Sequence, residues 1–250
     1  DVLLVVGSRL DIRQTGSDTA AFAAGRTIHH VDVDAAEVNN RIVGCQPLIA
    51  ELRPALAALL AAVRERGGSP ASAPAWCAEI GEVAASWPDT GELAGVAGIN
   101  PNLLMHQLSQ RLGVAAYVAD VGQHQMWAAQ SLELGPAQRF ITSGGMGAMG
   151  SGLPLAVGAC IAAGSAALIA GDGGFQLNIQ ELQTVARNEL DLKLVVLNNN
   201  SHGMVRQFQD AYFGGRYQST VWGYSAPSFA AVARAYEIPA SSVRDPSEVA

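Results

Sequence analysis

The chain has 250 residues, of which 49% are hydrophobic and 15% charged, so it can bury a sizeable core and exceeds one average domain. The net charge of −7, without a cluster of basic residues, argues against a nucleic-acid-binding surface. Cys45, Cys77 and Cys160 are isolated in the sequence, which argues against disulfides and zinc and favours a reducing cytoplasm.

The first residues predict part of a Rossmann-like layout. Residues 1–7 are typical of a buried strand that ends in glycine, and residues 26–34 of a second strand that ends in acids. Two interpretations of Asp32 and Asp34 stay open here. A carboxylate at such a strand end can hold a ribose hydroxyl, whereas the same residues can also cap a helix that begins at residue 35.

The middle of the chain indicates a boundary between two domains. Residues 47–64 predict a strongly apolar helix, because leucines recur at helical spacing. Residues 67–74 (GGSPASAP) have the composition of a linker, and residues 75–98 lack a clear period and predict a connection. We therefore expect a partial Rossmann-like domain over residues 1–66, a linker and connection over 67–98, and a second domain over 99–250.

The second domain is expected to open with a helix and a strand. Asn100 and the following proline predict the capped start of a helix over residues 101–112, and residues 114–119 predict a strand. Gln123 and His124 then lie at the carboxyl end of that strand. A lone histidine is more often a satisfied structural group than a ligand, but this position favours a contact with phosphate.

A glycine-rich loop follows at residues 143–153, with five glycines among eleven residues. Glycine at this density lets the backbone approach a ligand closely. The alternative is a plain flexible loop. Met146 and Met149 argue against that alternative, because a flat apolar ligand can pack on their thioethers.

Residues 151–171 carry no charge and are long enough in principle to span a bilayer. The run is mostly alanine and glycine, with Pro154 near its start. We therefore expect a buried helix followed by a buried strand rather than a membrane span.

The most informative stretch reads as a β-α-β unit. The apolar run over residues 167–170 stops at Gly-Asp-Gly-Gly, and a second run over residues 192–197 stops at three asparagines. In parallel sheets, ligands bind beyond the carboxyl ends of the strands, and Asp172 and Asn199 are expected at those ends. Carboxylate and carboxamide oxygens suit Mg²⁺ and its phosphate partners. Two further helices are expected over residues 205–213 and 228–236.

The pattern GDG-x24-NN resembles the thiamine-diphosphate signature, and longer segments narrow the resemblance. The chain resembles the large catalytic subunit of acetolactate (acetohydroxyacid) synthases. The segments that carry this resemblance are VGSRLDIRQTG, IHHVDVDAAEV, DVGQHQMWAAQ, TSGGMGAMGSGLPLAVGA, GDGGFQLNIQELQTVARNEL and LNNNSHGMVRQFQD. The resemblance implies an α/β fold, thiamine diphosphate and Mg²⁺ as cofactors, and decarboxylating condensation of 2-keto acids such as pyruvate, a transferase reaction of branched-chain amino acid biosynthesis. It also implies a homodimer or homotetramer with the site at the subunit interface.

The resemblance also implies roles for individual residues. Asp172, the Asn199 side chain and the Ser201 carbonyl would hold Mg²⁺. The Gly147 carbonyl would accept a hydrogen bond from the cofactor's amine, and Met149 would be the apolar wedge that bends the cofactor. The remaining residues expected to bind the cofactor are Gly122, Gln123, His124, Gly171, Gly173, Gly174, His202, Gly203 and Met204.

The chain departs from the family at two positions, since it has Gly147-Ala148-Met149 where the family usually has GTM, and Phe208 at the second. Phe208 stands where the family usually has a tryptophan that shapes the pocket for the second substrate, which leaves the acceptor open. The family's catalytic glutamate lies in an N-terminal domain that the sequence lacks. We therefore expect a catalytically inactive piece of a larger protein, truncated at its C-terminal end as well.

Three questions stay open at this stage. The biosynthetic synthases typically bind FAD, and the sequence does not decide whether this chain does. A different thiamine-diphosphate-dependent decarboxylase or carboligase is the near alternative. A non-catalytic nucleotide-binding module is the distant alternative.

Overall fold

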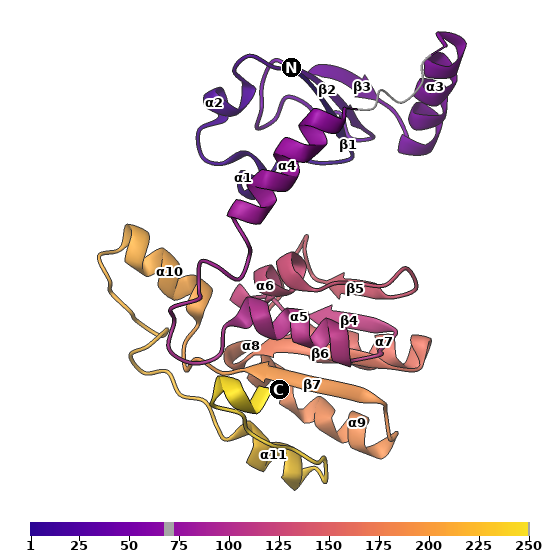
Figure 1. Cartoon of the computed structure of the whole chain (residues 1–250). Coiled ribbons are helices and arrows are strands. Elements are labelled where there is room, and N and C mark those ends of the chain that lie inside the picture. The colour runs from indigo at the N-terminus through magenta and orange to yellow at the C-terminus, as the bar shows by residue number, and fades with distance from the viewer. Residues whose placement is uncertain (68–72, 250) are drawn as a thin grey trace. The chain divides into compact units, whose positions relative to one another are not determined.

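The computed structural model describes residues 1–67 and 73–249, and the chain divides into two compact units, Asp1–Ile80 and Gly81–Ala250 (Figure 1). Both units combine parallel strands with helices, so the predicted α/β class is confirmed. The predicted linker over residues 67–74 lies largely outside the described residues.

The first unit is built on a three-stranded parallel sheet in the order β1-β2-β3. Val5 and Ile28 of the sheet pack with Leu10 and Ile42 in a small core. The elements of this unit are β1 (Val2–Val6), α1 (Ile12–Thr15), α2 (Thr19–Ala23), β2 (Thr27–Asp32), β3 (Gln46–Ile49) and α3 (Leu52–Glu65).

Of the two interpretations of Asp32 and Asp34, the helix cap is wrong, because residues 35–42 form turns and bends. Asp32 Oδ1 accepts a hydrogen bond of 2.9 Å from the Asp34 amide, and Asp34 Oδ1 accepts one of 2.8 Å from the Ala36 amide. Such local side-chain bonds satisfy amides without a helix and compete with helix formation.

Two further expectations need correction. The predicted helix over residues 47–64 begins only at Leu52, because Pro47 lies in strand β3 at the edge of the sheet. A proline is tolerated in an edge strand since it lacks an amide to donate. The leucines of α3 share helical spacing as expected, but Leu56, Leu59 and Leu60 are exposed. Residues 75–98, expected to be an aperiodic connection, contain most of a helix, α4 (Pro74–Ser86).

The second unit is built on a four-stranded parallel sheet in the order β5-β4-β6-β7. Its strands are β4 (Ala116–Ala119), β5 (Arg139–Thr142), β6 (Ala166–Gly171) and β7 (Leu192–Leu197). Its helices are α5 (Pro101–Arg111), α6 (Gln123–Ser131), α7 (Gly152–Ala163), α8 (Asp172–Leu177), η1 (Ile179–Glu181), α9 (Leu182–Arg187), α10 (Gly203–Tyr212), α11 (Phe229–Ala235) and η2 (Pro246–Val249).

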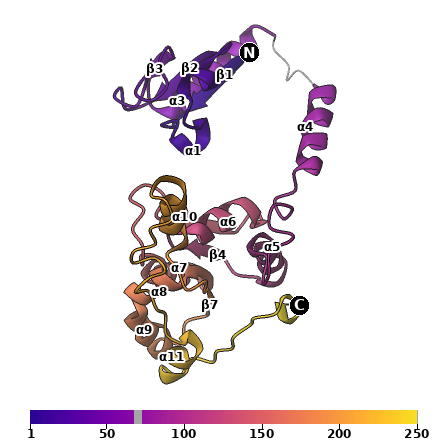
Figure 2. The same ribbon diagram turned by 90° about the vertical axis from the view of Figure 1, so that its left-hand side faces the viewer.

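Helices cover both faces of this sheet (Figures 1 and 2). Leu168 of β6 packs in a core with α7, α8, α9 and α11, whereas its neighbour Ile169 packs in a second core with α5 and α6. Successive side chains of a strand point to opposite faces, so both sets are buried. This double burial explains why β6 reads as a continuous apolar run.

The β-α-β unit, the capped start of α5 and the helices α10 and α11 are confirmed. Asn100 accepts hydrogen bonds from the amides of Asn102 and Leu103, with Pro101 at the first helical position. The uncharged run over residues 151–171 is divided between α7 and β6, as predicted. Within residues 1–67 and 73–249, no helix has the length and apolarity that crossing a bilayer requires.

Candidate functional site

The residues predicted to bind the metal follow the carboxyl ends of β6 and β7. The two strands are adjacent and parallel, and Gly171 at the end of β6 pairs in register with Leu197 at the end of β7. Asp172 therefore follows one strand at the edge where Asn198 and Asn199 follow the other. This register confirms the prediction that Asp172 and Asn199 follow adjacent strands at the same edge of the sheet.

Asp172 is buried, at 2% exposed, and begins α8 immediately after β6. Its Oδ2 accepts a hydrogen bond of 3.0 Å from the Tyr224 hydroxyl. That hydroxyl in turn accepts one of 3.3 Å from Gln176 Nε2. Burial, together with the hydrogen bond to Asp172 and its charge, raises the pKa of Tyr224. The phenol therefore stays protonated at neutral pH and acts as a donor to the carboxylate.

The loop after β7 contributes Asn199 and Ser201. Asn199 Oδ1 accepts a hydrogen bond of 3.2 Å from the Ser201 amide, which folds the loop back on itself. Ser201 is buried, and its Oγ has no hydrogen-bond partner within the described parts of the chain. Buried polar atoms normally have partners, so this hydroxyl is available to a ligand.

His124 lies in the first turn of α6, the helix that follows β4, and β4 is the other neighbour of β6 in the sheet. Burial lowers the pKa of His124 to about 4, although the charge of Asp120 and a hydrogen bond with its backbone act in the opposite direction. The ring is therefore neutral at pH 7. Its Nε2 is buried and has no partner among residues 1–67 and 73–249.

Close packing at this edge depends on several of the predicted glycines. A Cβ on Gly174 would lie 1.9 Å from Asp120 Oδ2, and one on Gly203 would lie 2.0 Å from Gln123 Oε1. Real Cβ contacts are never this short, so a side chain at either position would displace its neighbour. The same holds at Gly122 and Gly173, where a Cβ would meet the rings of His124 and His202, respectively.

The loop over residues 143–151 is anchored by Asp120, which sequence reasoning missed. Its Oδ1 accepts a hydrogen bond of 2.9 Å from the Gly152 amide, and its Oδ2 accepts one of 3.1 Å from the Gly150 amide. Gly147 lies within the loop at φ +68°, and Met149 is 38% exposed. Gly147 is exposed as well, so both residues are accessible to a ligand.

A polar cavity of about 290 Å³ lies over the loop after β7. Four of its lining residues were predicted to contact the cofactor or the metal: Gln123, Asn199, Ser201 and Gly203. Three others were not predicted and come from the next turns of α10: Arg206, Gln207 and Asp210. The cavity therefore combines oxygen and amide groups with one cationic and one anionic side chain.

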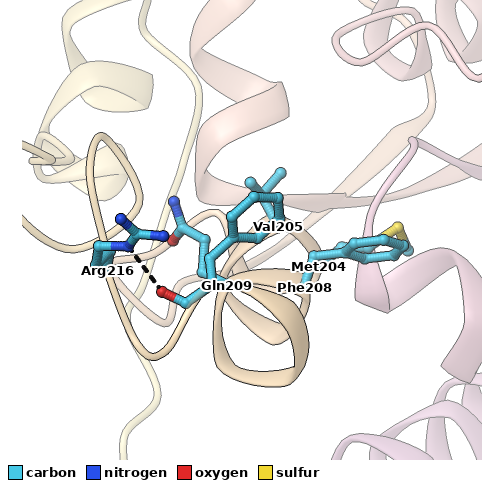
Figure 3. Close-up of a pocket in the computed structure, with 6 residues that line it drawn as sticks. Met204, Val205, Phe208, Gln209 and Arg216 are labelled. Atoms are coloured by element: carbon cyan, nitrogen blue, oxygen red, sulfur yellow. Dashed lines mark hydrogen bonds between the residues drawn. The ribbon is translucent and has the colours of Figure 1, made fainter.

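An apolar cavity of about 490 Å³ lies along α10 (Figure 3). Met204 and Phe208, both predicted from the sequence, line it. Four residues were not predicted: Val205, Gln209, Phe213 and Arg216. Arg216 Nε donates a hydrogen bond of 3.0 Å to the Phe213 carbonyl, which ties the segment after α10 back to its end (Figure 3).

These observations fit a site for Mg²⁺ and an organic diphosphate. Asp172 and Asn199 provide hard oxygen ligands, the type that Mg²⁺ prefers. The unpartnered Nε2 of His124 and Oγ of Ser201 are polar atoms that a phosphate can satisfy. The neutral ring of His124 would add no positive charge, so Mg²⁺ and Arg206 would balance the charge of a diphosphate.

Comparisons with known proteins agree with this chemistry. Residues 120–250 match the family described as "Thiamine pyrophosphate enzyme, C-terminal TPP binding domain". This range contains the candidate site described above.

Similar proteins over nearly the whole chain carry acetolactate synthase names. The chain is 41% identical to acetolactate synthase isozyme 2 large subunit of Escherichia coli K12, over 95% of the chain and 42% of that protein. It is 37% identical to acetolactate synthase of Arthrospira platensis, over 98% of the chain and 42% of that protein. It is 36% identical to the large subunit of Cyanidium caldarium, over 95% of the chain and 41% of that protein. The chain therefore spans about two fifths of the length of the relatives it matches.

Proposed function

Since the chain belongs to the thiamine pyrophosphate enzymes and contains their C-terminal TPP-binding domain, we propose that it supplies the metal and diphosphate half of an acetolactate synthase-like active site. The observation that carries this proposal is that buried Asp172 and the asparagine loop follow adjacent parallel strands at the same edge of the sheet. The names of the relatives support the choice of reaction, which would be the decarboxylating condensation of two 2-keto acids.

We assign the metal site to three groups. The Asp172 carboxylate, the Asn199 carboxamide and the Ser201 carbonyl would hold Mg²⁺. The diphosphate would contact Gln123, the buried His124 ring and the amides at the start of α8. The neighbouring glycines keep side chains away from these contacts, as the close approach at Gly203 indicates. His202 would border the same site, since it directly precedes α10.

Thiamine diphosphate, when bound, would supply the nucleophilic carbon and the electron sink that decarboxylation of a 2-keto acid requires. The chain's own contribution is binding and orientation. Gly147 would accept a hydrogen bond through its carbonyl, and Met149 would pack against the ring system. The glutamate that assists proton transfer in the family would lie in a preceding domain, reached across the interface of a homodimer or homotetramer.

We assign the second 2-keto acid to the apolar cavity along α10, because Phe208 forms its wall at the position where the family usually has tryptophan. Exchange of Phe208 for tryptophan would refill the cavity. Changes of this size in a pocket are worth about 1–3 kcal/mol in discrimination. In competition between pyruvate and 2-ketobutyrate, Phe208→Trp should change the product ratio of the full-length enzyme. An unchanged ratio would show that Phe208 does not contact the acceptor.

Product analysis tests the proposed reaction. The full-length protein, incubated with pyruvate, thiamine diphosphate and Mg²⁺, should form acetolactate. Acetaldehyde as the main product would contradict the synthase assignment and favour a decarboxylase. Binding of a nucleotide without any reaction of 2-keto acids would contradict the enzymatic assignment altogether.

A further inference from the structure

Tyr224 reaches the candidate metal site from a part of the chain in which the sequence showed no functional motif. It lies between α10 and α11, in an irregular segment over residues 217–227. The segment is tied to α10, because Gln209 Nε2 donates a hydrogen bond of 3.1 Å to the Gln218 carbonyl and Gln209 Oε1 accepts one from Thr220. Tyr224 is thus presented by a segment with defined contacts.

The phenol makes two polar contacts at the end of β6. Its hydroxyl donates to Asp172 Oδ2 over 3.0 Å and accepts from Gln176 Nε2 over 3.3 Å. Gln176 Nε2 also lies 3.2 Å from the Asp172 carbonyl, to which it donates. Asp172 is therefore held at both its carboxylate and its backbone by groups that also contact each other.

The ring of Tyr224 packs on the loop that follows β7. The Tyr224 and His202 ring centroids lie 4.6 Å apart at an interplanar angle of 69°, an edge-to-face contact. Gly173 makes room for this contact, since a Cβ there would lie 2.5 Å from the His202 ring and 3.4 Å from the Tyr224 hydroxyl. A single side chain therefore links the loop of Asn199 and Ser201 to the carboxylate of Asp172.

The two oxygens of the Asp172 carboxylate have different roles in this geometry. Oδ2 is engaged by a neutral donor, which fixes the plane of the carboxylate and leaves Oδ1 for a cation. Hydrogen bonds to metal-ligating carboxylates orient the ligand in this way, and their removal typically weakens metal affinity by about 10- to 100-fold.

We propose that Tyr224 is a positioning residue for Mg²⁺, which orients Asp172 through its hydroxyl and the Asn199–Ser201 loop through its ring. This inference rests on the proposed function of the same site. It assigns no chemical step to the phenol, which would act only through Asp172 and the loop after β7.

The test removes the hydroxyl and keeps the ring. In the full-length protein, Tyr224→Phe should weaken the affinity for Mg²⁺ about 10-fold, measured calorimetrically at saturating thiamine diphosphate. The melting temperature without metal should fall little, because the contact with His202 remains. The matched control is Tyr217→Phe, since the Tyr217 hydroxyl belongs to the same segment but bonds to Asp210. This control should bind Mg²⁺ as the parent does.

The outcomes separate this inference from the proposed function. Mg²⁺ affinity that is unchanged in Tyr224→Phe, while the parent binds Mg²⁺ and thiamine diphosphate, would overturn the role of Tyr224 alone. An equal loss of Mg²⁺ affinity in both variants would overturn it as well, because the effect would belong to the segment. A parent protein without Mg²⁺-dependent cofactor binding would overturn the proposed function and this inference together.

Discussion

Replacement of Asp120 by asparagine should detach the glycine-rich loop from the sheet. Asp120 is 1% exposed, and its two carboxylate oxygens accept hydrogen bonds from the Gly150 and Gly152 amides. Gly152 is the first residue of α7, where a negative charge is also favoured by the helix dipole. Asparagine has nearly the same shape, so the exchange tests the acceptor pair and its charge rather than packing.

The magnitude follows from the number of acceptors lost. Asparagine keeps one acceptor oxygen and turns an NH₂ group toward the other glycine amide, which leaves two buried donors facing each other. A hydrogen bond to a charged group is worth about 1.5–3 kcal/mol, and an unsatisfied buried donor costs about 1–3 kcal/mol. Part of this loss is offset because a neutral side chain is cheaper to bury than a carboxylate. We expect a net destabilisation of about 2–4 kcal/mol from these terms.

Urea unfolding followed by circular dichroism measures the effect. The control is Asp191→Asn, because the Asp191 side chain is 57% exposed and pairs with Lys193 at the surface. That exchange should change the free energy of unfolding by less than about 0.5 kcal/mol. If Asp120→Asn also cost less than about 1 kcal/mol, a single hydrogen bond, the loop would not depend on Asp120.

Two further predictions concern other parts of the second unit. Gly203→Ala should push the flexible Gln123 side chain aside. The affinity for thiamine diphosphate, measured by calorimetry, should then fall roughly fivefold, which corresponds to the loss of one neutral hydrogen bond. A large drop in melting temperature would instead show that the substitution acts on the fold. Burial alone would lower the pKa of His106, but hydrogen bonds to Asp89 and Glu133 and their charges raise it. Its stabilising contribution should therefore be complete below the ordinary value of 6.5 and be lost as the pH rises through the folded-state pKa. The melting temperature of His106→Gln should accordingly differ from that of the parent more at about pH 5.5 than at about pH 8.5, and a difference independent of pH would contradict this role.

The β-α-β unit could be predicted from the sequence because local and tertiary preferences agree there. Strand β6 lies inside the sheet and is buried almost throughout, whereas β7 is an edge strand whose apolar residues are mostly half-buried. In both strands the apolar run coincides with the strand. Polar residues interrupt each run at the point where the strand ends. The positions of Asp172 and Asn199 therefore followed from the sequence.

Predictions failed where a tertiary contact decides the local structure. Pro47 pairs opposite His30 in the sheet, a contact that periodicity within residues 47–64 does not reveal. The turn after β2 depends on amide contacts of Asp32 and Asp34, which read equally well as helix caps. Local patterns alone did not distinguish these alternatives.

The candidate site was predicted only in part, for a similar reason. Tyr224 lies 52 positions from Asp172, in a segment without a clear period, so its contact could not be derived. Asp120 was within reach, because it follows β4 just as Asp172 follows β6. An acidic residue at the end of a buried strand indicates a candidate functional or structural site, and Asp120 accepts hydrogen bonds from the Gly150 and Gly152 amides.

Calorimetric titration of thiamine diphosphate, with and without Mg²⁺, tests the central claim most directly. In the full-length parent, binding should depend on Mg²⁺. Asp172→Ala should abolish this dependence while the protein stays folded, as judged by circular dichroism. Binding of thiamine diphosphate to Asp172→Ala with the affinity and Mg²⁺ dependence of the parent would contradict the assignment of the metal site to this edge of the sheet.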